Sequence, residues 1–531
     1  MSNKATAPLS TPVLRSFLIG VLLPFLAACS LDAQILKHSL SLPSTVSFPN
    51  PIPGLFYATT PFITKWQTDA SWSSMSTDTQ IQLPLAPTGT YDFIVDWGDG
   101  SSSHISGWND PKKLHTYAVA GEYAVSILGG FTHIKMFDRN SYVYYGDYEK
   151  IKDVSQWGDN KWQNMSDMFT NTYISSFSAT DTPDTSEVTD MSYMFASAQS
   201  FNQALNFDTS QVTTMKGMFN SASAFNSPLN FSDTSNVTDM SEMFSAAAAF
   251  NQPLTFDTSK VTTMYMMFDG TPSFNQPLNF DASSLESTQY MFQNATSFNS
   301  TIQLPNSNIA LSDVSYMFYG ATAFNKSVTF DTSHVANMAR MFWKASAFNQ
   351  PINFDTSSVT DMSTMFMEAT AMNQPIQFSD TSKVESFGSM FTMATSFNQP
   401  LQFDTSSALN MYGMFWGASA FNQTLTFSDT SHVTEMSYMF YNATSFNKPL
   451  TLNTSAVTNM SAMFGGAAAF NQPLNFNTAN VSSMRWMFWN ATIFNQDLTA
   501  WVVNPKATSC SSFNASSALT QIPNFINCNP N

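Results

Sequence analysis

The chain has 531 residues and a formal net charge of −17, from 20 basic and 37 acidic residues. Phosphate binding needs clustered Lys and Arg, so this balance argues against a nucleic-acid partner and against adsorption to anionic lipid. The length exceeds one ordinary hydrophobic core, and 48 Phe and 32 Met residues recur at fixed spacing, which favours a repeat array over several globular domains.

The N-terminus has the pattern of an export signal. Arg15 precedes the apolar run 17–28, which is too short to cross a bilayer as a stable helix. The run leads into Leu-Ala-Ala-Cys, which ends at Cys29 and resembles a bacterial lipobox. The resemblance implies that residues 1–28 are a lipoprotein signal peptide and that Cys29 becomes acylated. The alternative is an ordinary signal peptide with a chance cysteine.

The residues after this cysteine predict how the protein is held. Ser30, in place of Asp, implies by resemblance to Gram-negative lipoproteins an outer-membrane lipoprotein at the bacterial cell surface. Its contact with the membrane is then through the lipid anchor only. Residues 29–60 are rich in Ser, Pro and Leu, so we expect them to form a flexible tether.

Residues 61–145 have the texture of a small β domain. The segment 91–97 is strand-like, Gly-Asp-Gly at 98–100 predicts a turn, and 123–127 predicts a second strand. With His-Thr-Tyr at 115–117, these motifs resemble the PKD family of immunoglobulin-like sandwiches. In that family the domain is mostly a spacer or a protein- and sugar-contact module, which is the role that the resemblance implies.

Three polar side chains of this domain are candidates for a chemical role. Asp96 and Asp99 offer the hard oxygen ligands that Ca2+ takes, although a turn-forming role for Asp99 is the favoured interpretation. His115 has no Ser or Cys partner that the sequence identifies, so a structural hydrogen bond is favoured over catalysis. The sequence predicts no cofactor and no metal site.

The dipeptide Met-Phe marks an internal repeat in the rest of the chain. Its Phe recurs at intervals of 24 to 26 residues, at Phe169, Phe195, Phe219, Phe244, Phe268, Phe292, Phe318, Phe342, Phe366, Phe391, Phe415, Phe440, Phe464 and Phe488. A fixed period of this length is the signature of stacked repeats.

Two patterns alternate within each repeat. Leu-Thr-Phe at 254–256 is apolar-polar-apolar, which predicts a short strand. Val261, Met264, Met267 and Phe268 are spaced 3, 3 and 1 apart, which predicts one face of a short helix. The Asp-Thr-Ser segment between them offers oxygens for a turn and an N-cap, without deciding which residue is the cap.

The repeated Phe-Asn-Gln-Pro-Leu, Asp-Thr-Ser and Val-Thr-x-Met-x-x-Met-Phe motifs resemble the leucine-rich-repeat surface proteins related to BspA. The predicted fold class is therefore an α/β repeat solenoid, leucine-rich-repeat-like, with one short parallel strand and one short helix per repeat. A small all-β immunoglobulin-like sandwich precedes it. We expect the solenoid over 146–500 and a C-terminal cap over 501–531, closed by a disulfide between Cys510 and Cys528.

Two residue types recur at the same position in most repeats, and each has a structural and a functional interpretation. The Asn of each Phe-Asn step forms a ladder that could bind a ligand, but backbone hydrogen bonds at a turn are favoured. The Met ladder is favoured as core packing over a site for a soft metal, because its spacing explains it without one.

The middle residue of each strand should point away from the core, and this strand column is the candidate binding face. Its members are polar and uncharged: Asn206, Asn230, Thr255, Asn279, Gln303, Thr329, Asn353, Gln377, Gln402, Thr426, Thr451 and Asn475. Amides and hydroxyls in a row suit a sugar or a protein surface. A merely solvated sheet face is an equal alternative.

The expected function is that of a cell-surface binding protein or adhesin, which recognises an extracellular protein or polysaccharide through an extended solenoid face. The alternative is a carbohydrate-capture or structural surface lipoprotein with no role in host adhesion. We expect no enzyme activity, because the sequence contains no recognisable nucleophile elbow, metal-ligand cluster or phosphate loop.

Overall fold

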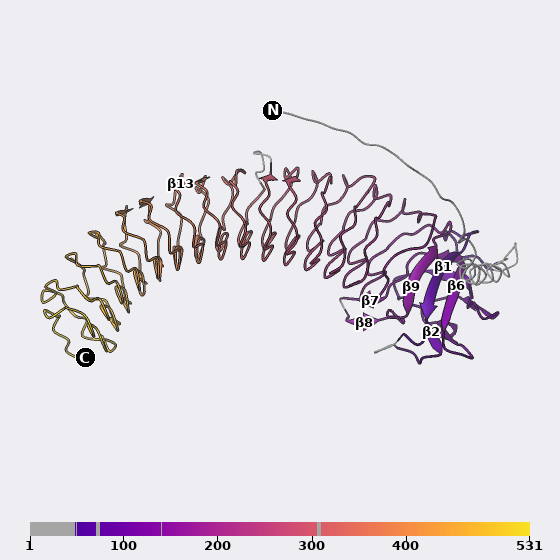
Figure 1. Cartoon of the computed structure of the whole chain (residues 1–531), viewed down its shortest axis with the longest axis horizontal. Helices are drawn as coiled ribbons and strands as arrows, with labels where there is room; N and C mark the ends of the chain where they lie inside the picture. Colours follow the sequence, from indigo (N-terminus) through magenta and orange to yellow (C-terminus); the bar gives the residue numbers. More distant parts are fainter. Residues whose placement is uncertain (1–47, 49, 71–74, 140, 305–309, 531) are drawn as a thin grey trace, which may run out of the picture.

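In the computed structural model the described residues are 48, 50–70, 75–139, 141–304 and 310–530. The predicted signal peptide and Cys29 lie outside these residues, as does most of the predicted tether. A β-rich N-terminal region leads into a curved stack of repeats (Figure 1). Both belong to one apolar core, which runs from Phe62 to Leu519.

The N-terminal region is built on a five-stranded antiparallel sheet with the order β4-β3-β6-β1-β9. Its strands are β1 (Phe62–Gln67), β3 (Tyr91–Asp96), β4 (Ser102–Ile105), β6 (Glu122–Phe131) and β9 (Ile151–Gln156). Separate two-stranded sheets pair β2 (Gln80–Gln82) with β5 (Leu114–Thr116), and β7 (Phe137–Asp138) with β8 (Val143–Tyr144). A 3-10 turn, η1 (Pro111–Lys113), precedes β5.

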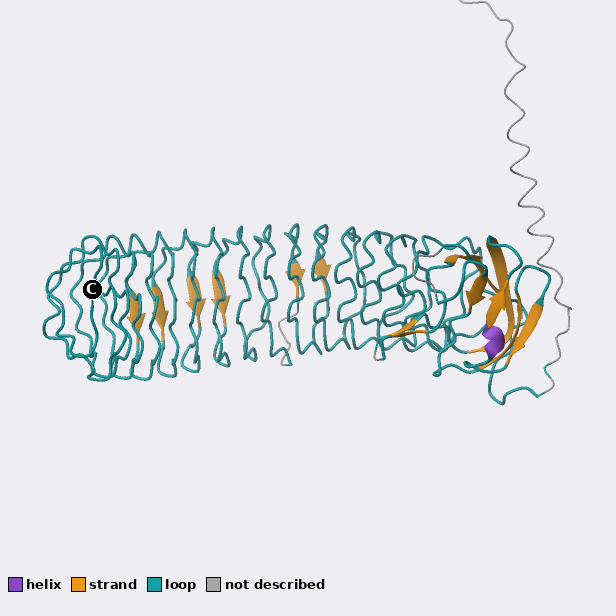
Figure 2. Ribbon diagram, turned by 90° about the horizontal axis from the view of Figure 1, so that it is seen from below, coloured by secondary structure: helices purple, strands orange, loops and turns teal. Residues whose placement is uncertain are grey.

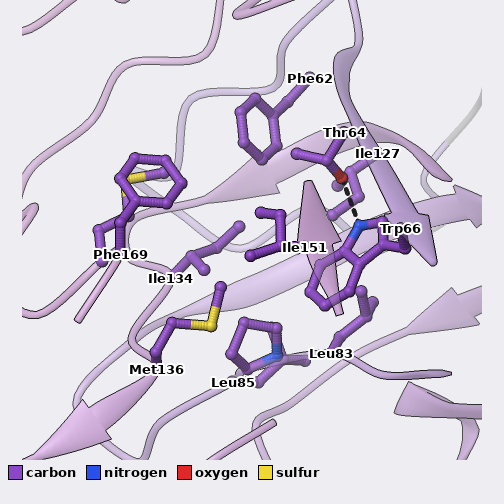
Figure 3. Close-up of a pocket in the computed structure, with 12 residues that line it drawn as sticks. Phe62, Thr64, Trp66, Leu83, Leu85, Ile127, Ile134, Met136, Ile151 and Phe169 are labelled. Carbon is purple, nitrogen blue, oxygen red and sulfur yellow. Dashed lines mark hydrogen bonds between the residues drawn. The ribbon is translucent and has the colours of Figure 1, made fainter. Parts of the chain in front are cut away.

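The buried face of β1 joins this sheet to the first repeat. Phe62, Thr64 and Trp66 point inward, and the Trp66 Nε1 donates to Thr64 Oγ1 at 2.7 Å. Figure 3 shows Phe169, from the first repeat, in the same cluster as Phe62 and Ile151. The free space here is about 10 Å³, which holds one water at most, so this cluster is core and not a ligand pocket.

The predicted fold class is wrong. The described residues contain no α-helix, and the strands form small separate sheets instead of a helix-backed array and a sandwich. Three parallel pairs occur in the repeats, and Figure 2 shows them as isolated arrows along the stack. They join β10 (Leu278–Asn279) to β11 (Ile302–Gln303), β12 (Ile352–Phe354) to β13 (Ile376–Phe378), and β14 (Leu401–Phe403) to β15 (Leu425–Phe427).

Left-handed residues explain why the Met-Phe segment is not a helix. Each complete repeat places two residues at positive φ, four positions apart, as at Glu242 (φ 58°) and Ala246 (φ 56°). An α-helix admits no such residue, because each one reverses the backbone twist. The segment is instead a chain of turns. Amides of Glu242, Phe244 and Ala246 donate to carbonyls of the next repeat at 2.7–3.0 Å, while the amides between them bond three residues back.

The spacing between repeats differs on the two sides of the stack. Ring centroids of successive Met-Phe phenylalanines are 5.4–5.7 Å apart. Those of successive strand phenylalanines are 5.8–6.4 Å apart. The stack must therefore curve with its strands outermost, and β13 lies on the convex edge in Figure 1. Asn171 of the first Met-Phe segment bonds Tyr144 of β8, which lies on the concave side.

The interior of each repeat is apolar and closed to solvent. Val261, Met264, Met267, Phe268 and Phe274 are each fully buried, and the equivalent residues of other repeats are too. At the C-terminal end, Cys510 occupies the position of the first Met and forms a disulfide with Cys528. Among the described residues there is no helix with the length and hydropathy that a membrane span requires.

Candidate interaction surfaces

The predicted strand column lies along the convex side, and all twelve of its residues, from Asn206 to Asn475, are exposed. In β12 the exposed Asn353 stands between the buried Ile352 and Phe354, and it is in register with Gln377 of β13. The Asn230 Nδ2 donates to Asn206 Oδ1 at 2.8 Å, so neighbouring members can bond to each other. The column is an open row of polar groups.

The Asp-Thr-Ser segment after each strand has a structural role in the turn. Asp257 Oδ1 accepts the Ser259 amide at 2.9 Å, and this bond lowers the pKa of the Asp257 carboxyl. The Thr258 hydroxyl is buried and donates to the Asp281 carbonyl of the next repeat at 2.8 Å. The aspartate therefore caps the turn, and the threonine links the repeats.

The Asn ladder has the structural role that was favoured from the sequence. The Oδ1 of each Asn accepts the backbone amide of the Asn one repeat later, at 2.8–3.1 Å in twelve successive steps from Asn202 to Asn495. These amides sit where a turn leaves backbone groups without a strand partner. The Oδ1 atoms satisfy these amides, so the ladder has a role in holding the backbone.

His115 and Asp99 form a structural contact in the N-terminal region. His115 Nε2 lies 2.8 Å from Asp99 Oδ2, and its ring stacks on Trp97 with centroids 4.6 Å apart. Burial raises the pKa of the Asp99 carboxyl, whereas hydrogen bonds from Ser101 and His115 lower it. The hydrogen bonds together have the larger effect, so the net shift of the pKa is downward. Asp96 Oδ1 accepts the Gly98 amide at 2.9 Å. Both aspartates thus hold the turn between β3 and β4.

Lys150 and Asp147 form a buried ion pair, and both side chains also hydrogen-bond to the backbone of residues 77–82. The Lys150 Nζ donates to the carbonyls of Thr77 and Gln80 at 2.8 and 2.9 Å, and Asp147 Oδ2 accepts the Gln82 amide at 2.7 Å. Burial lowers the pKa of Lys150. In the described part of the chain no group of three or more His, Cys, Asp or Glu residues is placed to hold a metal ion.

Aromatic residues gather on the concave side, a feature that the predicted strand column does not include. Every Tyr and Trp between residues 175 and 500 falls at one of three partly or fully exposed positions of the Met-Phe segment. This concave aromatic face consists of Tyr193, Tyr265, Tyr290, Tyr316, Tyr319, Trp343, Tyr412, Trp416, Tyr438, Tyr441, Trp486 and Trp489. The signal was present in the sequence as Tyr and Trp in the variable positions of Met-x-x-Met-Phe-x-x, but a helix prediction does not place these positions on one face.

These features define a tandem-repeat protein whose repeats share one core and are linked by backbone and side-chain ladders. The family model described as "Mycoplasma protein of unknown function, DUF285" matches four successive ranges, 163–255, 231–330, 312–428 and 421–525. The chain belongs to the DUF285 family. The tandem matches support a repeat surface protein of unknown function, without supporting the more specific leucine-rich-repeat or PKD likeness. No curated protein and no solved structure matches the chain.

Proposed function

We propose that this protein is a cell-surface binding protein, an adhesin in the broad sense, that recognises an extracellular protein or polysaccharide along its repeat stack. The observation that carries the proposal is the segregation of all twelve Tyr and Trp residues between residues 175 and 500 on the concave side. Aromatic side chains offer large, stiff contact areas at low entropic cost, which suits recognition of a partner.

The proposed mode of action is binding without chemical turnover. The repeated Asp and Thr side chains cap turns and link neighbouring repeats, as at Asp257 and Thr258. His115 is engaged by Asp99 and Trp97. A recognition role uses the length and curvature of the stack, which a single catalytic cleft does not need.

The proposed location is the bacterial cell surface, with the chain held in the outer membrane by acyl groups on Cys29. The support is the lipobox-like sequence that ends at this cysteine and the Ser30 that follows it. A Cys29→Ser variant should fail to incorporate a labelled fatty acid, while the unchanged chain incorporates it. Equal labelling of both would reject the anchor.

A second candidate function is carbohydrate capture, or a structural surface role, through the convex strand column. The observation in its favour is that all twelve members are exposed amides or hydroxyls in one row. Such a row offers repeated hydrogen-bond donors and acceptors to a polymer, although a merely hydrated surface would have the same appearance.

A glycan array and a panel of matrix proteins, probed with the chain from residue 30 onward, separate these functions. The matched variant carries Asn279→Lys, Asn353→Lys and Gln377→Lys in the strand column. Glycan binding that this variant loses supports carbohydrate capture by the convex side. Binding that it retains assigns the ligand to another face, and no binding to either set would reject the proposed function.

A further inference from the structure

A groove interrupts the concave aromatic face between Trp343 and Trp416. It has a volume of about 680 Å³, and its apolar surface comes from Met367, Met393 and Trp416. Met393 is 41% exposed, which is unusual for a methionine in a chain that buries most others. A groove of this size accepts one or two large side chains of a partner.

The Met393 side chain extends over a glycine of the next repeat. A Cβ added at Gly417 would lie 2.5 Å from the Met393 Sδ, so this side chain would have to shift if residue 417 were larger. The Trp416 ring stacks on Tyr438 at 5.1 Å, which fixes the opposite wall. The tryptophan wall is therefore held in place before any ligand arrives, which lowers the entropy lost on binding.

The orientation of the rings argues against a sugar as the occupant. A pyranose binds an aromatic residue across the open face of the ring. Here Tyr290 and Tyr316 stack on each other at 4.3 Å, and Trp416 and Tyr438 at 5.1 Å. The Arg340 guanidinium lies 5.0 Å from the Tyr316 ring centre. These stacking contacts cover one face of each ring and reduce the ring area that a sugar could cover, while the methionine side chains beside Trp416 suit an apolar side chain of a protein.

The charged residues beside the groove indicate which chemical group the partner presents next to its apolar side chain. Lys344 lines the groove and Arg340 precedes this lysine by four residues, and within the described residues neither forms an ion pair. Glu368 also lines the groove, and its Oε1 accepts a hydrogen bond from Trp343 Nε1 at 3.2 Å. In a chain of net charge −17 these two cations favour an acidic group next to the bound apolar side chain.

We propose that the Met367–Met393–Trp416 groove anchors an apolar side chain of a protein partner, with a carboxylate of the same segment facing Arg340 and Lys344. The residue types agree with this, because Trp, Tyr, Met and Arg are enriched at protein interfaces and dominate their binding energy. The proposal rests on the proposed function, and it deepens that function by assigning the face and the class of partner.

Met393→Gly is the sharpest variant, because Met393 has a φ of 57° that glycine adopts without strain. The substitution removes one wall and leaves the backbone more relaxed, so a loss of binding would not reflect misfolding. Trp416→Ala removes the other wall. Ala246→Gly, at the equivalent left-handed position four repeats before the groove's N-terminal edge, is the matched control.

The probe is a random-peptide display library selected on the chain from residue 30 onward. The expected peptides share a large apolar residue beside Asp or Glu. A synthetic copy should bind Met393→Gly and Trp416→Ala at least about tenfold more weakly than the unchanged chain, and the control equally well. Changing its acidic residue to Asn or Gln should also weaken binding.

Four outcomes would overturn the inference: no enriched peptide, peptides that bind Met393→Gly unchanged, a glycan whose binding this variant loses, or dimerisation of the chain through the groove. The first two leave the proposed function standing if the chain still binds a protein or glycan in the array and panel. Only the absence of every ligand would defeat both.

Discussion

Single residues decide the backbone of the Met-Phe segment. Left-handed conformation costs an ordinary residue about 1–2 kcal/mol, and glycine or asparagine adopts it more readily. At the second left-handed position of the repeats the chain uses Gly or Asn eight times, at Asn171, Gly270, Asn294, Gly320, Asn442, Gly417, Gly466 and Asn490. This enrichment was the available sequence signal against a helix.

Ala246→Gly tests that assignment. The exposed Ala246 has a φ of 56°, so glycine relieves about 1–2 kcal/mol of left-handed strain and adds only about 0.4–1 kcal/mol of chain entropy in the unfolded state. We expect a net gain of about 0.5–1 kcal/mol in the free energy of unfolding, measured by urea denaturation. Ala248→Gly, at a residue without positive φ, should destabilise instead. The same sign for both variants would contradict the assignment.

A buried histidine at the junction between sheet and repeats should make the protein sensitive to acid. His133 is 3% exposed, and burial lowers its pKa to about 4. In the unfolded chain the pKa of this histidine is about 6.5, so between about pH 4 and about pH 6.5 the unfolded chain binds a proton that the folded chain does not. The free energy of unfolding is therefore unaffected by His133 protonation above about pH 6.5. It falls as the pH drops towards 4, by up to about 3 kcal/mol.

Urea unfolding at pH 7 and pH 4.5 checks this expectation. His133→Gln should reduce the loss of stability between the two pH values, because its side chain takes up no proton in either state. The matched control is His334→Gln, at an exposed histidine of the repeats. If both variants lose as much stability as the unchanged chain, burial of His133 is not the cause.

At the scale of the element, hydrogen bonds between successive repeats take the place of regular helices and long sheets. Short strands pair only in places on the convex side, whereas the Met-Phe turns bond to the next repeat throughout the stack. The Asn and Thr ladders add side-chain bonds at the two turns that flank each strand. Each repeat therefore gains its stability from its neighbours more than from its own hydrogen bonds.

Asn349→Ala tests the ladder. The Asn349 Oδ1 accepts the Asn373 amide at 2.9 Å, and its removal leaves that half-buried backbone donor without its protein partner. We expect a loss of about 1–3 kcal/mol in the free energy of unfolding. Asn353→Ala, in the exposed strand column four residues later, should change stability by less than about 0.5 kcal/mol. Equal effects would mean that the ladder contributes nothing specific.

The whole molecule owes its curvature to the same bonds. Continuous backbone bonding holds the concave side at the shorter spacing, and the strand phenylalanines on the convex side are spread further apart. The arc places the acidic turns and the strand column outside, and the concave aromatic face inside. The two faces therefore differ in chemistry as well as in shape.

Deleting one complete repeat should shorten the arc without unfolding it. Removing residues 339–362 joins Met338 to Ser363 in the same register, because the equivalent residue in the next repeat is Met362. We expect a cooperative thermal transition close to that of the unchanged chain and a contour shorter by about 5 Å in X-ray scattering. Deleting only 339–350 should abolish folding, since it breaks the register. Loss of folding in both would show that the repeats do not act as equivalent units.

By itself the sequence determined the period, the buried Val, Met and Phe positions and the backbone role of the Asn ladder, because these depend on spacing along the chain. The tertiary structure alone decided that Val261, Met264, Met267 and Phe268 lie on a chain of turns and that the strands face outward. A spacing of 3, 3 and 1 states only which side chains are buried, and a helix and a chain of turns both satisfy it. The choice was made by amides that find their carbonyls in the neighbouring repeat, which a single repeat cannot supply.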